Sequence, residues 1–160
     1  MKRLLFLFLT ILSATVIMAS DSLNVRKLFA EMPDSVIPYL TKNNRLDLID
    51  FMDSNMKAEV TNELGGKSLM TALTDDSLSL RLNDACQIQL MLVADKRWLC
   101  LVSTIGVENE WSQSVVDFYT TSWQRLETAP KLGEADQKRI LAAKKELNIV
   151  ESVKKRLNKE

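Results

Sequence analysis

Two apolar runs with a short polar break between them dominate the middle of the chain, over residues 86–104 (CQIQLMLVADKRWLCLVST). The break is Ala94-Asp95-Lys96, and each run has the usual length of a β-strand. Runs that lie so close together predict two strands that pair as a β-hairpin. Because this is the most apolar part of the chain beyond its N-terminal segment, we expect the hairpin at the centre of the core.

Other stretches around the hairpin carry strand patterns of their own. Residues 77–82 alternate polar and apolar side chains, the pattern of a strand with one buried face. Residues 70–73 form a short candidate before it, residues 111–121 are rich in β-forming side chains, and residues 123–126 add a last candidate. Neighbouring strands joined by short turns usually pair in antiparallel fashion. The pattern predicts an antiparallel meander sheet of five or more strands, with residues 105–110 as a loop.

The region before the sheet has helical spacing. Leu48, Phe51 and Met52 recur at i, i+3 and i+4 and form one apolar stripe, which predicts a helix over residues 45–56. Asn43-Asn44 offers the N-cap of this helix. Two prolines before it limit the preceding chain to short helical turns. We therefore expect two or three short N-terminal helices that pack on the sheet.

A second helical pattern follows the sheet, over residues 134–147. Pro130 and Gly133 mark the boundary before it. The predicted fold class is α+β, with N-terminal helices on one face of an antiparallel meander and a C-terminal helical tail. We divide the chain into a domain over residues 20–130 and a basic helical tail over residues 131–160.

The first nineteen residues have the layout of a secretory signal peptide. Lys2 and Arg3 form a basic head, residues 4–18 are almost entirely apolar, and the small residues Ala19 and Ser20 follow. We expect cleavage near Ala19 or Ser20 and a periplasmic or secreted protein with no transmembrane anchor. An uncleaved anchor is the alternative, which the shortness of the apolar stretch disfavours.

Charge is balanced over the chain but uneven along it. The sequence has 21 basic and 21 acidic residues, and loss of the signal peptide leaves a net charge of −2. Residues 20–130 carry a net −6 and residues 131–160 a net +4. An exported domain with this excess of acids is a poor candidate for nucleic-acid binding. The basic tail could dock on the acidic domain, contact an envelope partner or an anionic membrane, or remain a solvated helix.

The complete absence of histidine removes several classes of chemistry. Catalysis with an imidazole base is excluded, and the commonest metal ligand is missing. The stretch Gly65-Gly66-Lys67-Ser68 resembles the end of a phosphate-binding loop, but Thr61 stands where the first glycine of that motif is required. We interpret it as a turn and expect no cofactor.

The carboxylates that remain form two candidate groups. Asp47, Asp50 and Asp53 are spaced i, i+3, i+6 on the predicted helix and could bind a hard cation, but a solvated face opposite the apolar stripe explains them as well. Asp75 and Asp76 could act as a pair, but aspartate is also common in turns. A carboxylate-dependent hydrolase of the envelope would have to use one of these groups.

Aromatic residues on or beside the predicted strands are the other candidates. Trp98, Trp111, Tyr119 and Trp123 could bind sugar or peptide from a sheet face, but aromatics in such positions more often fill the core. We keep Trp111, Tyr119 and Trp123 as candidate ligand-binding or partner-binding residues. Trp111 is the strongest of them, because it follows the polar run Glu108-Asn109-Glu110.

The two cysteines both fall on the central hairpin. An exported protein with two cysteines favours a disulfide. A turn centred on Asp95, however, places Cys86 opposite Thr104 and Cys100 opposite Leu90, on one face but about 13 Å apart along the strands. A disulfide requires Cα atoms within about 7 Å of each other. The sequence therefore predicts two buried free thiols.

Several segments, in order along residues 28–126, resemble an uncharacterised family of secreted proteins from Bacteroidales, a domain family of unknown function. They are Phe29-Ala30-Glu31-Met32-Pro33-Asp34-Ser35, Leu40-Thr41-Lys42-Asn43-Asn44-Arg45-Leu46-Asp47, Gly65-Gly66-Lys67-Ser68, Leu73-Thr74-Asp75-Asp76 and Phe118-Tyr119-Thr120-Thr121-Ser122-Trp123. The resemblance implies export and one compact domain, and it implies no catalytic residues.

Taken together, these features favour a non-catalytic periplasmic or secreted binding module over the envelope hydrolase. A meander with helices on one face leaves the other face free, and such a face can bind an envelope protein, a peptide or a lipid. An apolar, concave free face with exposed tryptophan or tyrosine would favour binding, and two converging carboxylates would favour hydrolysis.

Overall fold

The computed structural model describes residues 23–107 and 111–147. The predicted signal peptide and the last part of the tail lie outside these residues. The elements are α1 (Val25–Ala30), α2 (Lys42–Asp53), β1 (Glu59–Thr61), β2 (Lys67–Leu73), β3 (Ser77–Asn83), β4 (Cys86–Val93), β5 (Trp98–Val107), β6 (Trp111–Thr120) and α3 (Glu134–Leu147).

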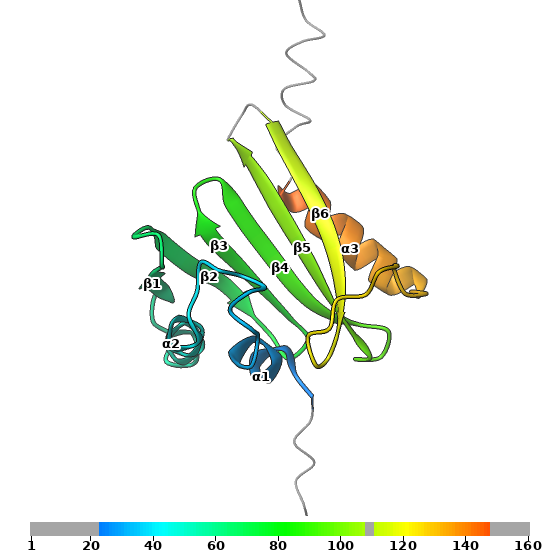
Figure 1. Cartoon of the computed structure of the whole chain (residues 1–160), viewed down its shortest axis with the longest axis horizontal. Helices are drawn as coiled ribbons and strands as arrows, with labels where there is room; N and C mark the ends of the chain where they lie inside the picture. The colour runs from blue at the N-terminus through cyan, green and yellow to red at the C-terminus, as the bar shows by residue number, and fades with distance from the viewer. Residues whose placement is uncertain (1–22, 108–110, 148–160) are drawn as a thin grey trace, which may run out of the picture.

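The six strands form one sheet in the order β1-β2-β3-β4-β5-β6, and every neighbouring pair is antiparallel. Helices α1 and α2 lie on one face and α3 lies on the other (Figure 1). α2 contacts β1 and β2, α1 contacts β3 and β4, and α3 contacts β4, β5 and β6. The predicted α+β class with an antiparallel meander is confirmed.

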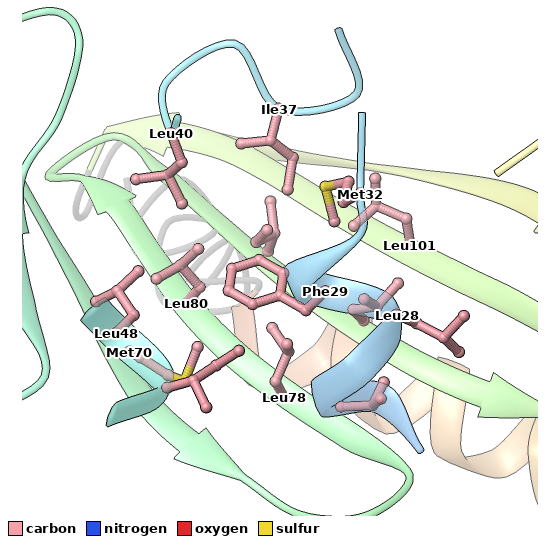
Figure 2. Close-up of a cluster of buried hydrophobic side chains, with 14 of the residues drawn as sticks. Leu28, Phe29, Met32, Ile37, Leu40, Leu48, Met70, Leu78, Leu80 and Leu101 are labelled. Carbon is pink, nitrogen blue, oxygen red and sulfur yellow. The ribbon is translucent and has the colours of Figure 1, made fainter. Parts of the chain in front are cut away.

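The first core lies between the sheet and the two N-terminal helices. The alternation in β3 turns Leu78, Leu80 and Leu82 inward, and all three are buried. Phe29 of α1 lies among leucine side chains from β3 and from the chain that leads to α2 (Figure 2). α1, α2 and the irregular segment between them thus cover this face together.

Local capping sets where the two N-terminal helices begin. The Asn24 side chain accepts a hydrogen bond from the backbone N–H of Lys27 at the start of α1. At α2 the Thr41 hydroxyl accepts from the N–H of Asn44, and the Asn44 side chain accepts from the N–H of Thr41. This reciprocal capping box stabilises an earlier start than the asparagine cap that we expected.

A second, smaller apolar cluster lies on the opposite face, under α3. Ile140 and Ala143 of α3 pack against Met91, Val93, Cys100, Val102 and Phe118. The expectation that this face is entirely free is therefore wrong over β4, β5 and β6. The reason is that β4 is apolar on both faces near its end, so it requires a cover on each side.

Four strand assignments differ from the prediction. β2 begins at Lys67, three residues before the predicted start. β1 was not predicted, because three residues are too few for a visible alternation. β5 continues to Val107 through residues that we expected in a loop. Residues 123–126 form no strand and pair with β6 only through the isolated bridge between Tyr119 and Arg125.

The hairpin register differs from the prediction by one residue, because the tip contains four residues rather than three. Val93 pairs with Trp98, and Ala94, Asp95 and Lys96 all have positive φ angles of 51°, 54° and 63°. Cys100 consequently faces Met91 and Cys86 faces Ile105. Both cysteines are free, as predicted, but they lie on opposite faces of the sheet, since a shift of one residue exchanges the faces. Cys100 is buried and Cys86 is only partly buried.

Candidate functional site

The part of the second face that α3 does not contact, over β2, β3 and β4, carries a shallow pocket with a volume of about 350 Å³. Its lining residues are Leu69, Thr71, Ser79, Leu80, Arg81, Gln87, Ile88 and Gln89. This volume is at the lower end of the range for small-ligand sites. We refer to these residues as the polar pocket.

The strand pairing brings the polar side chains of the pocket together. Arg81 pairs with Gln87 on one side and with Leu69 on the other, and Ser79 pairs with Gln89. Residues that pair directly across an antiparallel sheet project from the same face, about 5 Å apart.

The side chains that alternate with the polar residues on the same strands point into the first core and anchor the floor of the pocket. Leu80 and Ile88 are buried in the first core, so their neighbours Ser79, Arg81 and Gln87 project from the opposite face. The floor is therefore anchored by the core that α1 and α2 complete, and not by α3.

Positive charge gathers beside the pocket at the β1 edge. A hydrogen bond from Lys57 lowers the pKa of Glu59 below its usual value, and desolvation partly opposes this shift. The positive charges of Lys57, Lys67 and Arg81 lower the pKa of Glu59 further. The Lys57 ammonium lies 2.5 Å from the Glu59 carboxylate. Lys67 donates a hydrogen bond of 2.9 Å to the Thr61 hydroxyl. Three cations thus act on a single carboxylate, although the domain as a whole is acidic.

α3 is fixed to the far end of the same face by polar contacts with two turns. The Asp136 carboxylate accepts a hydrogen bond of 2.8 Å from the backbone N–H of Ala94, at the strained hairpin tip. Arg139 donates to the Leu92 carbonyl at 3.1 Å and to Asp76 at 2.9 Å. These contacts hold α3 over the apolar cluster and leave the polar pocket open beside it.

Comparison with known proteins places the chain in a family. A model of the family described as "Protein of unknown function (DUF3256)" matches residues 17–157, which is most of the chain. The chain belongs to the DUF3256 family. No curated protein matches it.

A solved structure gives the fold of this DUF3256 protein independent support. It is a domain of an uncharacterized protein from Porphyromonas gingivalis, with a TM-score of 0.50 and 24% sequence identity. The match covers 64% of this chain and 53% of the other, so this chain spans about half the length of its structural relative. Such a likeness shows the fold alone. Membership of an uncharacterised family, which the sequence resemblance predicted, is confirmed.

Two of the three predicted aromatic site residues lie together, away from the pocket. Trp123 is buried in the first core, where its ring contacts Tyr119 at a centroid distance of 5.6 Å and its Nε1 donates to the Leu28 carbonyl at 3.0 Å. Burial raises the pKa of Tyr119, and the charge of Asp117 adds to this. This pair ties β6 to α1. A ligand-binding role for either residue stays an untested prediction.

The third residue, Trp111, begins β6, and its side chain lies outside the described residues. Trp98 packs against the second apolar cluster. Trp98 and Trp123 therefore both pack against apolar clusters, and ligand binding by Trp123 is not tested by this packing.

The predicted carboxylate groups do not converge on a site. Asp47, Asp50 and Asp53 are exposed on α2, and Asp53 forms an ion pair with Arg26. Asp76 pairs with Arg139 instead. Within residues 23–107 and 111–147, no group of three or more potential metal ligands is arranged around one point.

The pocket residues themselves were missed at the sequence level. Ser79, Arg81, Gln87 and Gln89 are the polar members of the alternation that predicted the strands. That alternation identifies a solvent face, but every half-exposed strand has one. Only the position of α3 distinguishes the open part of the face from the covered part.

Proposed function

We propose that this DUF3256 protein is a non-catalytic binding module, exported to the periplasm or the cell exterior, and that its ligand binds in the polar pocket. The observation that carries the proposal is the open pocket on β2, β3 and β4, where hydroxyl, amide and guanidinium side chains share one face of the sheet. Small-ligand sites combine such a concavity with a few placed polar groups.

Export is supported by the basic head, the apolar stretch and the small residues at Ala19 and Ser20. In the described part of the chain, no helix is both long enough and apolar enough to cross a membrane. Expression in a Gram-negative host, followed by mass spectrometry of the N-terminus, tests this step. We expect processing near Ala19 or Ser20 and recovery outside the cytoplasm. An intact N-terminus in the cytoplasmic fraction would refute export.

Binding is favoured over hydrolysis by the composition of the pocket. Its lining includes no carboxylate, whereas the hydrolase alternative requires two across a cleft. The pocket also lacks the tryptophan or tyrosine that an apolar binding face would present. The site fits a polar ligand that is held by hydrogen bonds.

A variant that fills the pocket tests the location of the site. Ser79→Tyr places a ring among the lining residues on β3, and tyrosine is well suited to a strand. Gln113→Tyr makes a similar change at an exposed position of β6, outside the pocket. Ligands found by an NMR screen of polar metabolites and short peptides should lose binding to Ser79→Tyr and retain it with Gln113→Tyr. Ligands that bind both variants as they bind the wild type would rule out the pocket.

A further inference from the structure

We infer that the polar pocket recognises a peptide-like ligand through its carboxylate, with Arg81 as the anchoring residue. This inference rests on the proposed function and specifies the class of ligand. It combines three features of the described residues, which are an unpaired guanidinium, two side-chain amides beside it and a local excess of positive charge.

Arg81 is exposed at the pocket and has no ion-pair partner among the described residues. Arg125 and Arg139, by contrast, each form an ion pair with an aspartate. A guanidinium presents a planar pair of donors that matches the two oxygens of a carboxylate. Arg81 is therefore free to take an acidic group from a ligand.

Gln87 pairs directly with Arg81, and Gln89 lies two residues further along β4 on the same face. A glutamine amide offers one carbonyl acceptor and two N–H donors, which is the chemical equivalent of a peptide group. A peptide whose carboxylate is bound by Arg81 would place its preceding amide groups along β4. Leu69, which pairs with Arg81 from β2, supplies an apolar surface for an aliphatic side chain.

The charge around the pocket favours an anion. Lys57, Lys67 and Arg81 all act on Glu59, so this corner of the sheet has more positive than negative charge. The pocket volume of about 350 Å³ suits a terminal dipeptide better than a longer segment. Both features select a short chain end with a free carboxylate.

NMR titration of the processed protein tests the inference with three probes. They are N-acetyl-dialanine, its C-terminal amide, which lacks the charge, and glucuronate, which keeps a carboxylate but lacks the amides. We expect N-acetyl-dialanine to shift the amide resonances of residues 79–81 and 87–89. Its C-terminal amide should bind at least about tenfold more weakly, the effect of losing a charge-assisted hydrogen bond.

Three arginine variants give the matched comparison. Arg81→Gln should weaken binding of N-acetyl-dialanine by about tenfold or more. Arg97→Gln removes the same charge from an exposed residue at the opposite end of β4 and should leave the affinity unchanged. Arg81→Lys keeps the charge but loses the planar pair of donors, and should give an intermediate affinity.

Each other result overturns the inference in a recognisable way. Equal binding of the acid and the amide, or equal losses in Arg81→Gln and Arg97→Gln, would show that the carboxylate is not the recognised group. Binding of glucuronate without the dipeptide would refute a peptide-like ligand. Any of these results would contradict the inferred class of ligand but would still be compatible with the pocket as a binding site. Absence of binding by all three probes overturns the inference, while the Ser79→Tyr comparison separately decides the proposed function.

Discussion

Arg45 shows how one charged residue can organise an irregular segment. Its side chain is only 1% exposed, and its guanidinium donates to the Leu40 carbonyl at 2.8 Å, to the Met32 carbonyl and to Asp34 at 2.7 Å. The chain between α1 and α2 forms turns, so these carbonyls have no helical or strand partner. A buried carbonyl without a hydrogen-bond partner destabilises the folded protein, and the hydrogen bonds from Arg45 avoid this destabilisation.

Replacement of Arg45 by methionine should therefore destabilise the protein strongly. Arg45→Met keeps most of the side-chain volume but leaves the carbonyls of Met32 and Leu40 unpaired, at about 1–3 kcal/mol each. Asp34→Asn is the control, because the Asp34 side chain is 65% exposed and its ion pair should contribute less than about 1 kcal/mol. Urea unfolding curves measure both. Equal losses would mean that the ion pair, and not the carbonyl contacts, carries the stability.

Cys100 should make the stability of the protein depend on alkaline pH. Burial in the second cluster raises the pKa of this thiol from 9.0 to about 12, and the charge of Asp136 adds to this. Well below pH 9 the thiol is protonated in both states and contributes no pH dependence. Between pH 9 and about 12 only the unfolded chain loses the proton, so stability falls as pH rises, by up to about 1.4 kcal/mol per pH unit.

The variant Cys100→Ala isolates this contribution from the other groups that titrate at alkaline pH. Urea unfolding at pH 8, 9, 10 and 11 gives the slope of stability against pH for each protein. The loss of packing in Cys100→Ala lowers stability by a constant amount, whereas the slope above pH 9 should become shallower. Parallel slopes would show that Cys100 ionises as readily in the folded protein as in the unfolded one.

At the scale of elements, the sequence predicted most strands because alternation depends on local burial. The same local signal could not fix the hairpin register, since the number of residues in the tip depends on backbone angles. Three consecutive positive φ values at residues 94–96, none of them at glycine, are not visible in composition. The pocket could not be predicted for a similar reason. Its polar residues could be recognised in the sequence, but the part of the sheet face that α3 covers could not.

Adjacent alanines in α3 allow a test of how this helix docks. Ala143 is 2% exposed in the second cluster, whereas Ala142 is exposed on the outer side of the helix. The substitution Ala→Glu has the same effect on helix propensity at both positions. Ala143→Glu should cost about 2–4 kcal/mol, because it places a carboxylate against apolar side chains.

The control Ala142→Glu should change stability by less than about 0.5 kcal/mol, as surface substitutions usually do. Urea unfolding gives the free energies, and binding of an apolar dye reports whether the cluster becomes exposed. Equal, small effects of the two variants would show that α3 does not stay on the sheet in solution.

At the scale of the whole molecule, one sheet supports two cores of different size. The larger core joins α1, α2 and the inner face of all the strands, and Trp123 extends it to the end of β6. The smaller core depends on α3. The polar pocket lies on the part of the second face that α3 does not contact, opposite the larger core. A binding site placed there has a rigid floor and does not require α3 to move.

Deletion of residues 131–160 tests this division. The truncated chain keeps the larger core and all six strands, so it should still unfold cooperatively and retain its β-sheet circular dichroism. It loses Ile140 and Ala143 from the second cluster and the contacts of Arg139 with Asp76, so its stability should fall. The exposed apolar side chains, including Val93, Val102 and Phe118, should bind an apolar dye and promote self-association. Loss of cooperative unfolding would instead show that α3 is required for the fold, and that the chain cannot be divided at Pro130.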